Sequence, residues 1–191
     1  MILGTGTQQL ETPRLILRKF AKNDAKNAFR HWCGDKEVTP YLKWHYHLHP
    51  LQTEQTLEYW VREYRDPFCF HWAITLKSTG DIIGGISLAV KDKFDENGEL
   101  GYSLGSSYWR QGYGMEAAKA VLDYAFCTIG FHRIEAVCAC ENTASAHLLQ
   151  RLGMQYEGRH RQLCRLSTGS FADCFSYSML SEDYLALYHP Q

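Results

Sequence analysis

The stretch that decides the fold is Tyr108–Ala117, which reads Tyr-Trp-Arg-Gln-Gly-Tyr-Gly-Met-Glu-Ala. Gly112 and Gly114 free the backbone to turn sharply and let a ligand approach closely. The strongest helical stripe of the chain begins at Met115, and the start of a helix offers unpaired amide hydrogens and the positive end of its dipole. Because Arg110 adds a positive charge nearby, the stretch predicts an anion site where a strand leads into a helix.

Other interpretations of this loop differ in what they require. An ordinary glycine turn before a helix needs no ligand at all. A Walker loop needs Gly-x-x-x-x-Gly-Lys, which does not occur in the sequence. A dinucleotide fingerprint needs a third glycine, which is absent here. The two glycines alone are therefore compatible with two interpretations: an ordinary turn, or an anion site that is neither a Walker loop nor a dinucleotide fingerprint.

The hydrophobic pattern on both sides of the loop predicts a mixed α/β fold. Strands are expected over residues 14–18, 70–76, 82–90, 100–104, 133–141, 154–159 and 171–180, and helices over 25–32, 57–64, 115–129 and 143–152. Asn23 and Asp24 are expected to cap the first helix and Asn142 the last. Gly130 stands where the third helix should end.

The bulk composition narrows the class of protein. A chain of 191 residues, 45% hydrophobic, suits one domain, expected to have a core of about 12–180 and extensions at 1–11 and 181–191. Its 20 basic and 21 acidic residues argue against nucleic-acid binding. No apolar run of 18 residues and no signal-like start occur, which favours the cytoplasm. Seven cysteines without Cys-x-x-Cys argue against a disulfide framework or a zinc knuckle.

Several further motifs stand in a fixed order around the loop. They are Glu11–Leu15 with Leu17, Trp72–Ile74, Gly80, Ile83–Gly84, Gly101–Tyr102 with Leu104, Gly112–Gly114 with Glu116–Ala117, Arg133–Ile134 with Ala136, Asn142, Ser145, Leu152–Gly153, Glu157–Gly158 and Arg161. With these motifs the sequence resembles the GNAT acetyltransferase superfamily, and within it the RimJ/RimL-like (ribosomal-protein-alanine N-acetyltransferase) branch. The resemblance implies an α/β (α+β) acyl-CoA N-acyltransferase fold. In this fold a mixed, mostly antiparallel central sheet is splayed between two strands and flanked by about four helices.

The resemblance also implies a coenzyme site for acetyl-CoA as co-substrate, with no metal. The amides of Arg110–Met115 would hold the pyrophosphate, and the pantetheine would pair with the backbone of Tyr102–Leu104. That strand must then splay from Arg133–Glu141, and Gly101 and Gly105 are expected to mark the bulge or bend. The expected coenzyme residues are Tyr102, Ser103, Leu104, Trp109, Arg110, Gln111, Gly112, Tyr113, Gly114, Met115, Asn142 and Ser145.

Two positions depart from the wider superfamily. Trp109 stands where a Gln or Arg begins its loop motif, a change that this branch often tolerates. Leu149 stands where many members carry a tyrosine acid, so that acid is excluded at this position. Glu99, just before the strand that ends at the loop, is the candidate general base, directly or through water. Ser145, in the first turn of a helix whose side chains lean toward its start, is the candidate proton donor. A solvated charge in a turn and a helix-start serine bonded to backbone are the simpler interpretations.

The resemblance implies that Tyr41–His49 covers the acceptor amine, and Trp44, His45 and His47 are the expected substrate residues. The alternate spacing of His45, His47 and His49 resembles a metal set on one strand face, but no carboxylate or cysteine stands beside them. The expected reaction is direct transfer of an acetyl group to a primary amine, foremost a protein or peptide N-terminal α-amine. A polyamine or aminoglycoside acetyltransferase and a non-catalytic acyl-CoA sensor stay open as alternatives, as does a homodimer.

Overall fold

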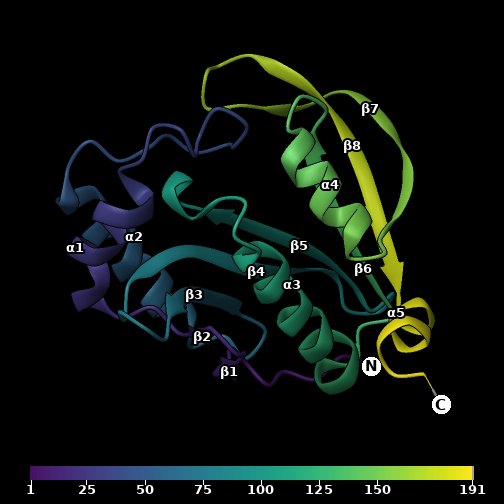
Figure 1. Ribbon diagram of the computed structural model, residues 1–191. Helices are drawn as coiled ribbons and strands as arrows, with labels where there is room; N and C mark the ends of the chain where they lie inside the picture. Colours follow the sequence, from purple (N-terminus) through teal and green to yellow (C-terminus); the bar gives the residue numbers. More distant parts are fainter. Residues whose placement is uncertain (191) are drawn as a thin grey trace.

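A single eight-stranded sheet is the frame of the computed structural model, which describes residues 1–190 (Figure 1). Its strands are β1 (Leu10–Glu11), β2 (Leu15–Arg18), β3 (Phe70–Leu76), β4 (Ile82–Asp92), β5 (Asn97–Leu104), β6 (Arg133–Ala139), β7 (Gln155–Arg165) and β8 (Phe171–Leu180). Their spatial order is β1-β2-β3-β4-β5-β6-β8-β7. Every neighbouring pair is antiparallel except β5 and β6, which are parallel. The predicted mixed, mostly antiparallel sheet is confirmed.

Within residues 1–190 the structure has five α-helices, one more than the sequence predicts. They are α1 (Ala25–Ala28), α2 (Pro50–Glu63), α3 (Tyr113–Asp123), α4 (Thr143–Arg151) and α5 (Ser181–Tyr188). Tighter or wider helical turns extend them at Lys22–Asp24, Phe29–Cys33 and Tyr124–Ile129, and another forms Ser106–Tyr108. The short strand β1 and helix α5 lie in stretches expected to be extensions, and position 191 lies outside the described residues.

The helices cover opposite faces of the sheet because successive strand residues point to opposite sides. Trp72 on β3 and Ile86 on β4 pack in one core cluster with Val121 of α3. Ala73, the next residue on β3, packs in a second cluster with Leu57 of α2. Each such buried large side chain contributes about 1.5–3 kcal/mol to the free energy of unfolding. Two cores thus hold α3 on one face and α1 with α2 on the other.

The sheet opens between its two parallel strands. β5 pairs with β6 only from Asn97 to Glu99, which face Arg133 to Glu135. Beyond this point β5 continues to Leu104 and β6 to Ala139 without pairing, so the predicted splay is confirmed. The carboxyl-terminal half of β5 therefore leaves an edge of unpaired backbone inside the molecule.

The predicted bulge at Gly101 is wrong. β5 keeps an unbroken register with β4 from Gly98 to Leu104, and the only irregularity of this pair lies between Val90 and Asp92. Gly105 serves a different purpose, because a Cβ there would lie 1.9 Å from the carbonyl oxygen of His31. The splay thus comes from β6 leaving β5, and Gly105 allows the chain to pass closely beneath the turn that follows α1.

The end signals predicted at Asn142 and Gly130 are confirmed, whereas the second helix begins at Pro50 rather than near 57 and the predicted cap of the first helix fails. Asn142 Oδ1 accepts the Ser145 amide at 3.1 Å, and Gly130 ends the long helix with φ +87°. Asp24 instead accepts the amide of Ala21 at 2.7 Å and the guanidinium of Arg18, so it closes the turn from inside. The predicted cap by Asn23 and Asp24 is therefore wrong, because the helical turns begin earlier, at Lys22, and the Asp24 carboxylate bonds the Ala21 amide and Arg18.

Two further features concern the lengths of the helices and the state of the cysteines. Among residues 1–190, none of the helices combines the length and the apolarity needed to cross a bilayer. All seven cysteines are free thiols.

Candidate active site

The glycine loop, defined here as Arg110–Met115, turns from the end of β5 into α3. Gly112 has φ +82°, a conformation that side chains with a Cβ rarely adopt, and Arg110 has φ +59°. The first bond of the helix runs from the Glu116 amide to the Gly112 carbonyl at 3.0 Å. The amides of Tyr113, Gly114 and Met115 therefore have no carbonyl of their own helix to bond and are free for a ligand.

A brace from the amino-terminal segment holds this loop, and the sequence analysis missed it. Glu116 accepts hydrogen bonds from the Thr12 hydroxyl at 2.6 Å and from the Arg14 amide at 2.9 Å. The guanidinium of Arg14 pairs with Glu116 at 2.6 Å, donates to the Gln111 carbonyl at 2.9 Å and lies 4.4 Å from the centre of the Tyr113 ring. Burial alone would raise the pKa of Glu116, but these hydrogen bonds outweigh it and lower the pKa.

Further contacts hold the loop, and Trp109 just before it, against β5, the Ser106–Tyr108 turn and α4. The Trp109 indole donates to the Leu104 carbonyl at 2.8 Å, and the side-chain Nε2 of Gln111 donates to the Ser107 carbonyl at 2.8 Å. Gly114 faces Leu148 of α4, where a Cβ would lie 3.0 Å from a methyl group. The loop is thus fixed by its neighbours, and the small residue allows α3 to approach α4.

Two hydroxyl groups meet in the gap between β5 and β6. The Tyr102 hydroxyl on β5 lies 2.8 Å from Ser145 Oγ on α4, so one donates to the other. Burial raises the pKa of Tyr102, which keeps its phenol protonated. The gap therefore contains a linked pair of neutral proton donors, of which the sequence predicted Ser145. Leu149 is buried, and the phenol comes from the strand instead.

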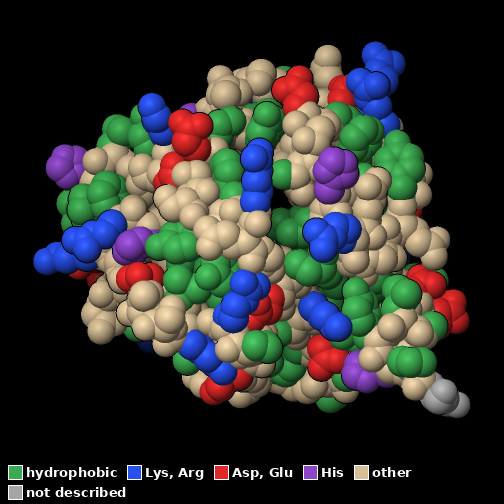
Figure 2. Space-filling view, in the orientation of Figure 1, with side chains coloured by type: hydrophobic (Ala, Val, Ile, Leu, Met, Phe, Trp, Pro, Cys, Tyr) green, Lys and Arg blue, Asp and Glu red, His purple; other side chains and the backbone are tan. Residues whose placement is uncertain are grey.

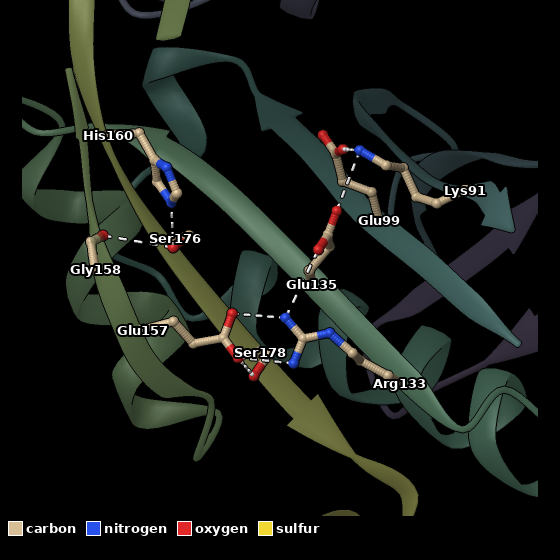
Figure 3. A network of polar contacts seen from close by, with 9 residues as sticks. All are labelled: Lys91, Glu99, Arg133, Glu135, Glu157, Gly158, His160, Ser176 and Ser178. Carbon is tan, nitrogen blue, oxygen red and sulfur yellow. Dashed lines mark hydrogen bonds and ion pairs between the residues drawn. The ribbon is translucent and has the colours of Figure 1, made fainter. Parts of the chain in front are cut away.

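Glu99 stands where β5 and β6 part, inside a chain of ion pairs (Figure 3). Lys91 lies 3.1 Å from Glu99 and 3.2 Å from Glu135, so the two carboxylates of neighbouring strands share one ammonium. Arg133 continues the chain from Glu135 to Glu157, at 3.7 and 2.6 Å. Glu99 differs from Glu135 in that it also lines the cleft described next.

One cleft with a volume of about 1050 Å³ joins the glycine loop to the expected acceptor segment. Figure 2 shows this side of the molecule hollowed near its centre, with Lys and Arg side chains at the rim. The predicted coenzyme residues that line the cleft are Tyr102, Ser103, Leu104, Trp109, Arg110, Gly112, Tyr113, Gly114, Met115, Asn142 and Ser145. Gln111 is the exception. The structure therefore brings together nearly all of the residues expected to hold a coenzyme.

At the other end of the cleft lie residues of the expected acceptor segment. Trp44 and His47 line it, with their rings 6.0 Å apart, and His47 Nδ1 lies 2.8 Å from Thr53 Oγ1. Burial lowers the pKa of His47. His45 is exposed and is not among the lining residues. The segment forms turns and bends, so the strand that would align three histidines on one face does not exist.

Three residues that line this end of the cleft were not predicted from the sequence to belong to the site. Trp32 donates its indole N–H to Ser103 Oγ at 3.0 Å, and its ring lies 6.1 Å from that of Trp60. His71 on β3 meets Trp60 edge to face, with centroids 4.4 Å apart. The tryptophans stood out only as members of helical stripes, because their meeting depends on long-range packing. We call Trp32, Trp44, Trp60 and His71 the acceptor half of the cleft.

The observed features fit an acyl-coenzyme A. A pyrophosphate suits the free amides and the positive end of α3, beside Arg110. An amide-bearing chain suits the unpaired edge of β5, as an added strand does. The glycine loop has room for such a close approach, since a Cβ at Gly112 would meet only the Arg14 guanidinium, at 3.2 Å.

Comparisons with known proteins agree with this geometry. A model of the acetyltransferase (GNAT) domain family matches residues 14–155. The uncharacterized N-acetyltransferase p20 of Bacillus licheniformis is 30% identical over 177 residues, which cover 93% of this chain and 98% of that protein. The uncharacterized N-acetyltransferase YoaA of Bacillus subtilis (strain 168) is 34% identical over 157 residues, 80% of this chain and 86% of that protein.

Solved structures share the fold at lower identity. Mycobacterium smegmatis RimJ, in complex with CoA-disulfide, has a TM-score of 0.83 and 21% identity, covering 100% of this chain and 93% of that one. The ribosomal-protein-S5-alanine acetyltransferase of Vibrio fischeri has a TM-score of 0.80 and 24% identity, covering 93% and 98%.

Fold, cleft and family match together define an acyl-CoA-dependent transferase. The chain belongs to the GNAT family of N-acetyltransferases, which use acetyl-CoA, and the resemblance to the GNAT superfamily drawn from the sequence is confirmed.

Proposed function

We propose that this enzyme acetylates the N-terminal α-amine of a protein or peptide. The observation that carries the proposal is the continuous cleft, which runs from the braced glycine loop past the opening between β5 and β6 to the acceptor half. An acceptor entering from the acceptor half meets the opening from the sheet face opposite α3. The ribosomal-protein-S5-alanine acetyltransferase of Vibrio fischeri shares the fold, which favours a protein acceptor.

The cofactor supplies an activated acetyl group, and the residues of the chain handle its binding and the protons. The amides of Tyr113–Met115 and the charge of Arg110 would bind the pyrophosphate, and the free edge of β5 at Tyr102–Ser103 would pair with the pantetheine. Asn142, Ser145 and Leu104 would line the same channel. Binding by backbone groups requires the loop to be held in place beforehand, which the Arg14–Glu116 brace does.

Proton transfer falls to two sites on either side of the opening. Glu99 would accept the proton lost by the ammonium, directly or through water. Ser145 Oγ, linked to the Tyr102 hydroxyl, would give a proton to the leaving thiolate. An α-amine has a pKa near 7.7–8.0, whereas that of a lysine amine is about 10.4. A shared carboxylate such as Glu99 therefore suits an α-amine better than a strongly basic amine.

The test is the release of free thiol from acetyl-CoA over a panel of amines. Peptides with different free N-termini should be turned over well above spermidine and an aminoglycoside, and an N-terminally blocked peptide is the control. A preference for spermidine or the aminoglycoside would assign a small-molecule enzyme. Tight acetyl-CoA binding with no thiol release from any amine would instead assign a sensor.

A further inference from the structure

A row of three residues crosses the sheet beneath the acceptor half. His71 on β3 faces Ser87 on β4, and Ser87 faces Gly101 on β5. Residues directly opposite each other in antiparallel strands point to the same face, so all three share the face that α1 and α2 cover elsewhere. All three line the cleft. Past Gly101 there is no further strand, because β6 has already left β5.

The space over Ser87, beside Gly101, is the place for an amine. Gly101 has no side chain, and a Cβ there would touch only Ser87 Oγ, at 3.4 Å. Neighbouring strands lie about 4.8 Å apart, so the row from β3 to β5 spans about 10 Å. That length leaves room above Ser87 and Gly101 for an amine between the imidazole and the opening.

The position of the His71 side chain is fixed from several sides. Its backbone amide donates to Thr7 Oγ1 at 2.9 Å, and the Tyr64 hydroxyl donates to its carbonyl at 2.8 Å. The ring packs against Trp60 at 4.4 Å and Phe20 at 5.1 Å. Within residues 1–190 its ring nitrogens have no hydrogen-bond partner, although the ring stands in a built aromatic wall. A polar group held this firmly and left unused in a substrate cleft points to a ligand.

We propose that His71 binds the acceptor amine, with one ring nitrogen accepting a hydrogen bond from the amine N–H above Ser87, on the side toward Gly101. This inference rests on the proposed function and adds to it the residue that orients the nucleophile. Glu99 lies two residues from Gly101 on the same face of β5, so the amine would stand between an imidazole that orients it and a carboxylate that takes its proton.

The charge state of the imidazole agrees with a role in orienting the amine, while Glu99 accepts the proton. Burial lowers the pKa of His71 to about 4, so the ring is neutral at physiological pH and keeps a lone pair. A neutral acceptor orients an amine without repelling it and without competing for its proton. The acceptor class that fits is a primary amine of low basicity on an apolar carbon, which describes a peptide N-terminus better than a polyamine.

The test uses the whole protein with His71→Phe, which keeps an aromatic ring, and His71→Gln, which keeps a hydrogen-bonding group. Binding of a peptide with a free N-terminal alanine is measured by calorimetry on the protein loaded with CoA, where no reaction occurs. Thiol release is measured in parallel. His160→Phe is the control, because His160 lies on β7 outside the cleft lining.

His71→Phe should weaken peptide binding and raise the acceptor KM by at least about fivefold, as expected for one lost hydrogen bond in a cleft. kcat and acetyl-CoA affinity should change less, and His71→Gln should recover part of the loss. If the wild type turns the peptide over and His71→Phe binds it equally well, this inference alone is overturned. If the wild type neither binds the peptide nor releases thiol, the proposed function is overturned too.

Discussion

The two halves of the cleft are built on opposite plans. In the glycine loop the groups offered to a ligand are backbone amides, and side chains such as Arg14 and Glu116 serve to hold them. In the acceptor half the groups offered are side chains, and Trp32, Trp60 and His71 are held by one another's rings. A site of backbone amides binds any ligand with the same phosphate geometry. A site made of side chains can change its specificity through single substitutions.

The largest effect on the contrast between the two halves is expected from Gly112→Val, which changes the glycine loop. The φ of +82° is hostile to a branched side chain, so the free amides should lose their arrangement. We expect acetyl-CoA affinity, measured by calorimetry, to fall by at least about thirtyfold, which corresponds to roughly 2 kcal/mol. Gly80→Val is the matched control, because Gly80 has φ +76° in the turn of the β3–β4 hairpin and does not line the cleft. Equal losses in both variants would mean that only general stability had changed.

The hydroxyl groups of Tyr102 and Ser145 lie where the two halves of the cleft meet, so substituting them tests the chemistry at that point. Ser145→Ala and Tyr102→Phe should each lower kcat by about ten- to a hundredfold, with acetyl-CoA affinity little changed. Because the two groups share one hydrogen bond, the double variant should lose little more than either single one. Tyr188→Phe, whose hydroxyl bonds the remote Leu152 carbonyl, is the control. Fully additive losses would show that the hydroxyls act separately.

Glu99→Gln separates a catalytic carboxylate from a structural one. We expect kcat to fall by at least about tenfold, with acetyl-CoA affinity little changed. Glu135→Gln is a close control, because Glu135 binds the same ammonium of Lys91 but does not line the cleft. If both variants lose activity alike, the role belongs to the Lys91 ion-pair network rather than to a base.

Trp44→Ala tests whether the acceptor half can be changed without affecting the glycine loop. Loss of this wall should raise the acceptor KM by about three- to tenfold, through lost burial and ring contacts, and leave acetyl-CoA affinity unchanged. His47→Ala should act in the same direction. His45→Ala is the internal control, since that side chain is exposed outside the cleft. A fall in acetyl-CoA affinity in Trp44→Ala would show that the halves are not independent.

The contrast also explains how far the sequence could predict the structure. The glycine loop, the Asn142 cap and the strands follow from local patterns, because glycine conformations, caps and alternation act within a few residues. The acceptor half unites residues 32, 44, 60 and 71 from four segments, and no local pattern encodes that meeting. The same reason hid the Arg14–Glu116 brace, whose partners are 102 residues apart.

Two predictions that applied a local rule failed, for different reasons. Asp24 looked like a helix cap, but the Arg18 guanidinium at 2.7 Å claims its carboxylate. Gly101 looked like a bulge, yet its missing side chain instead leaves space over the floor of the cleft. Helix α5 was missed because its eight residues show no strong stripe from sequence, although Tyr184 is buried against Phe126.

The smallest effect we predict concerns the brace, through Glu116→Gln. The ionised carboxylate accepts from Thr12 and Arg14, and charged hydrogen bonds of this kind contribute about 1.5–3 kcal/mol each before the replacement amide recovers part of the loss. We therefore expect Tm at neutral pH to fall by about 2–6 °C, at roughly 2–4 °C per kcal/mol for a chain of this size. Acetyl-CoA affinity should fall far less than in Gly112→Val, because the loop keeps its glycine and loses only part of its support.

The pH dependence of that variant has a definite sign. Because the pKa of Glu116 is lowered in the folded protein, its stabilisation is fully present above the unfolded-state pKa of about 4.3 and is lost as the pH falls through the folded-state value. The difference in Tm between wild type and Glu116→Gln should thus be constant near neutrality and shrink below about pH 4.3. Glu182→Gln, a change in the first turn of α5, controls for the removal of any one carboxylate. A difference that stays constant into acid would show that Glu116 supports the glycine loop by its shape rather than by its charge.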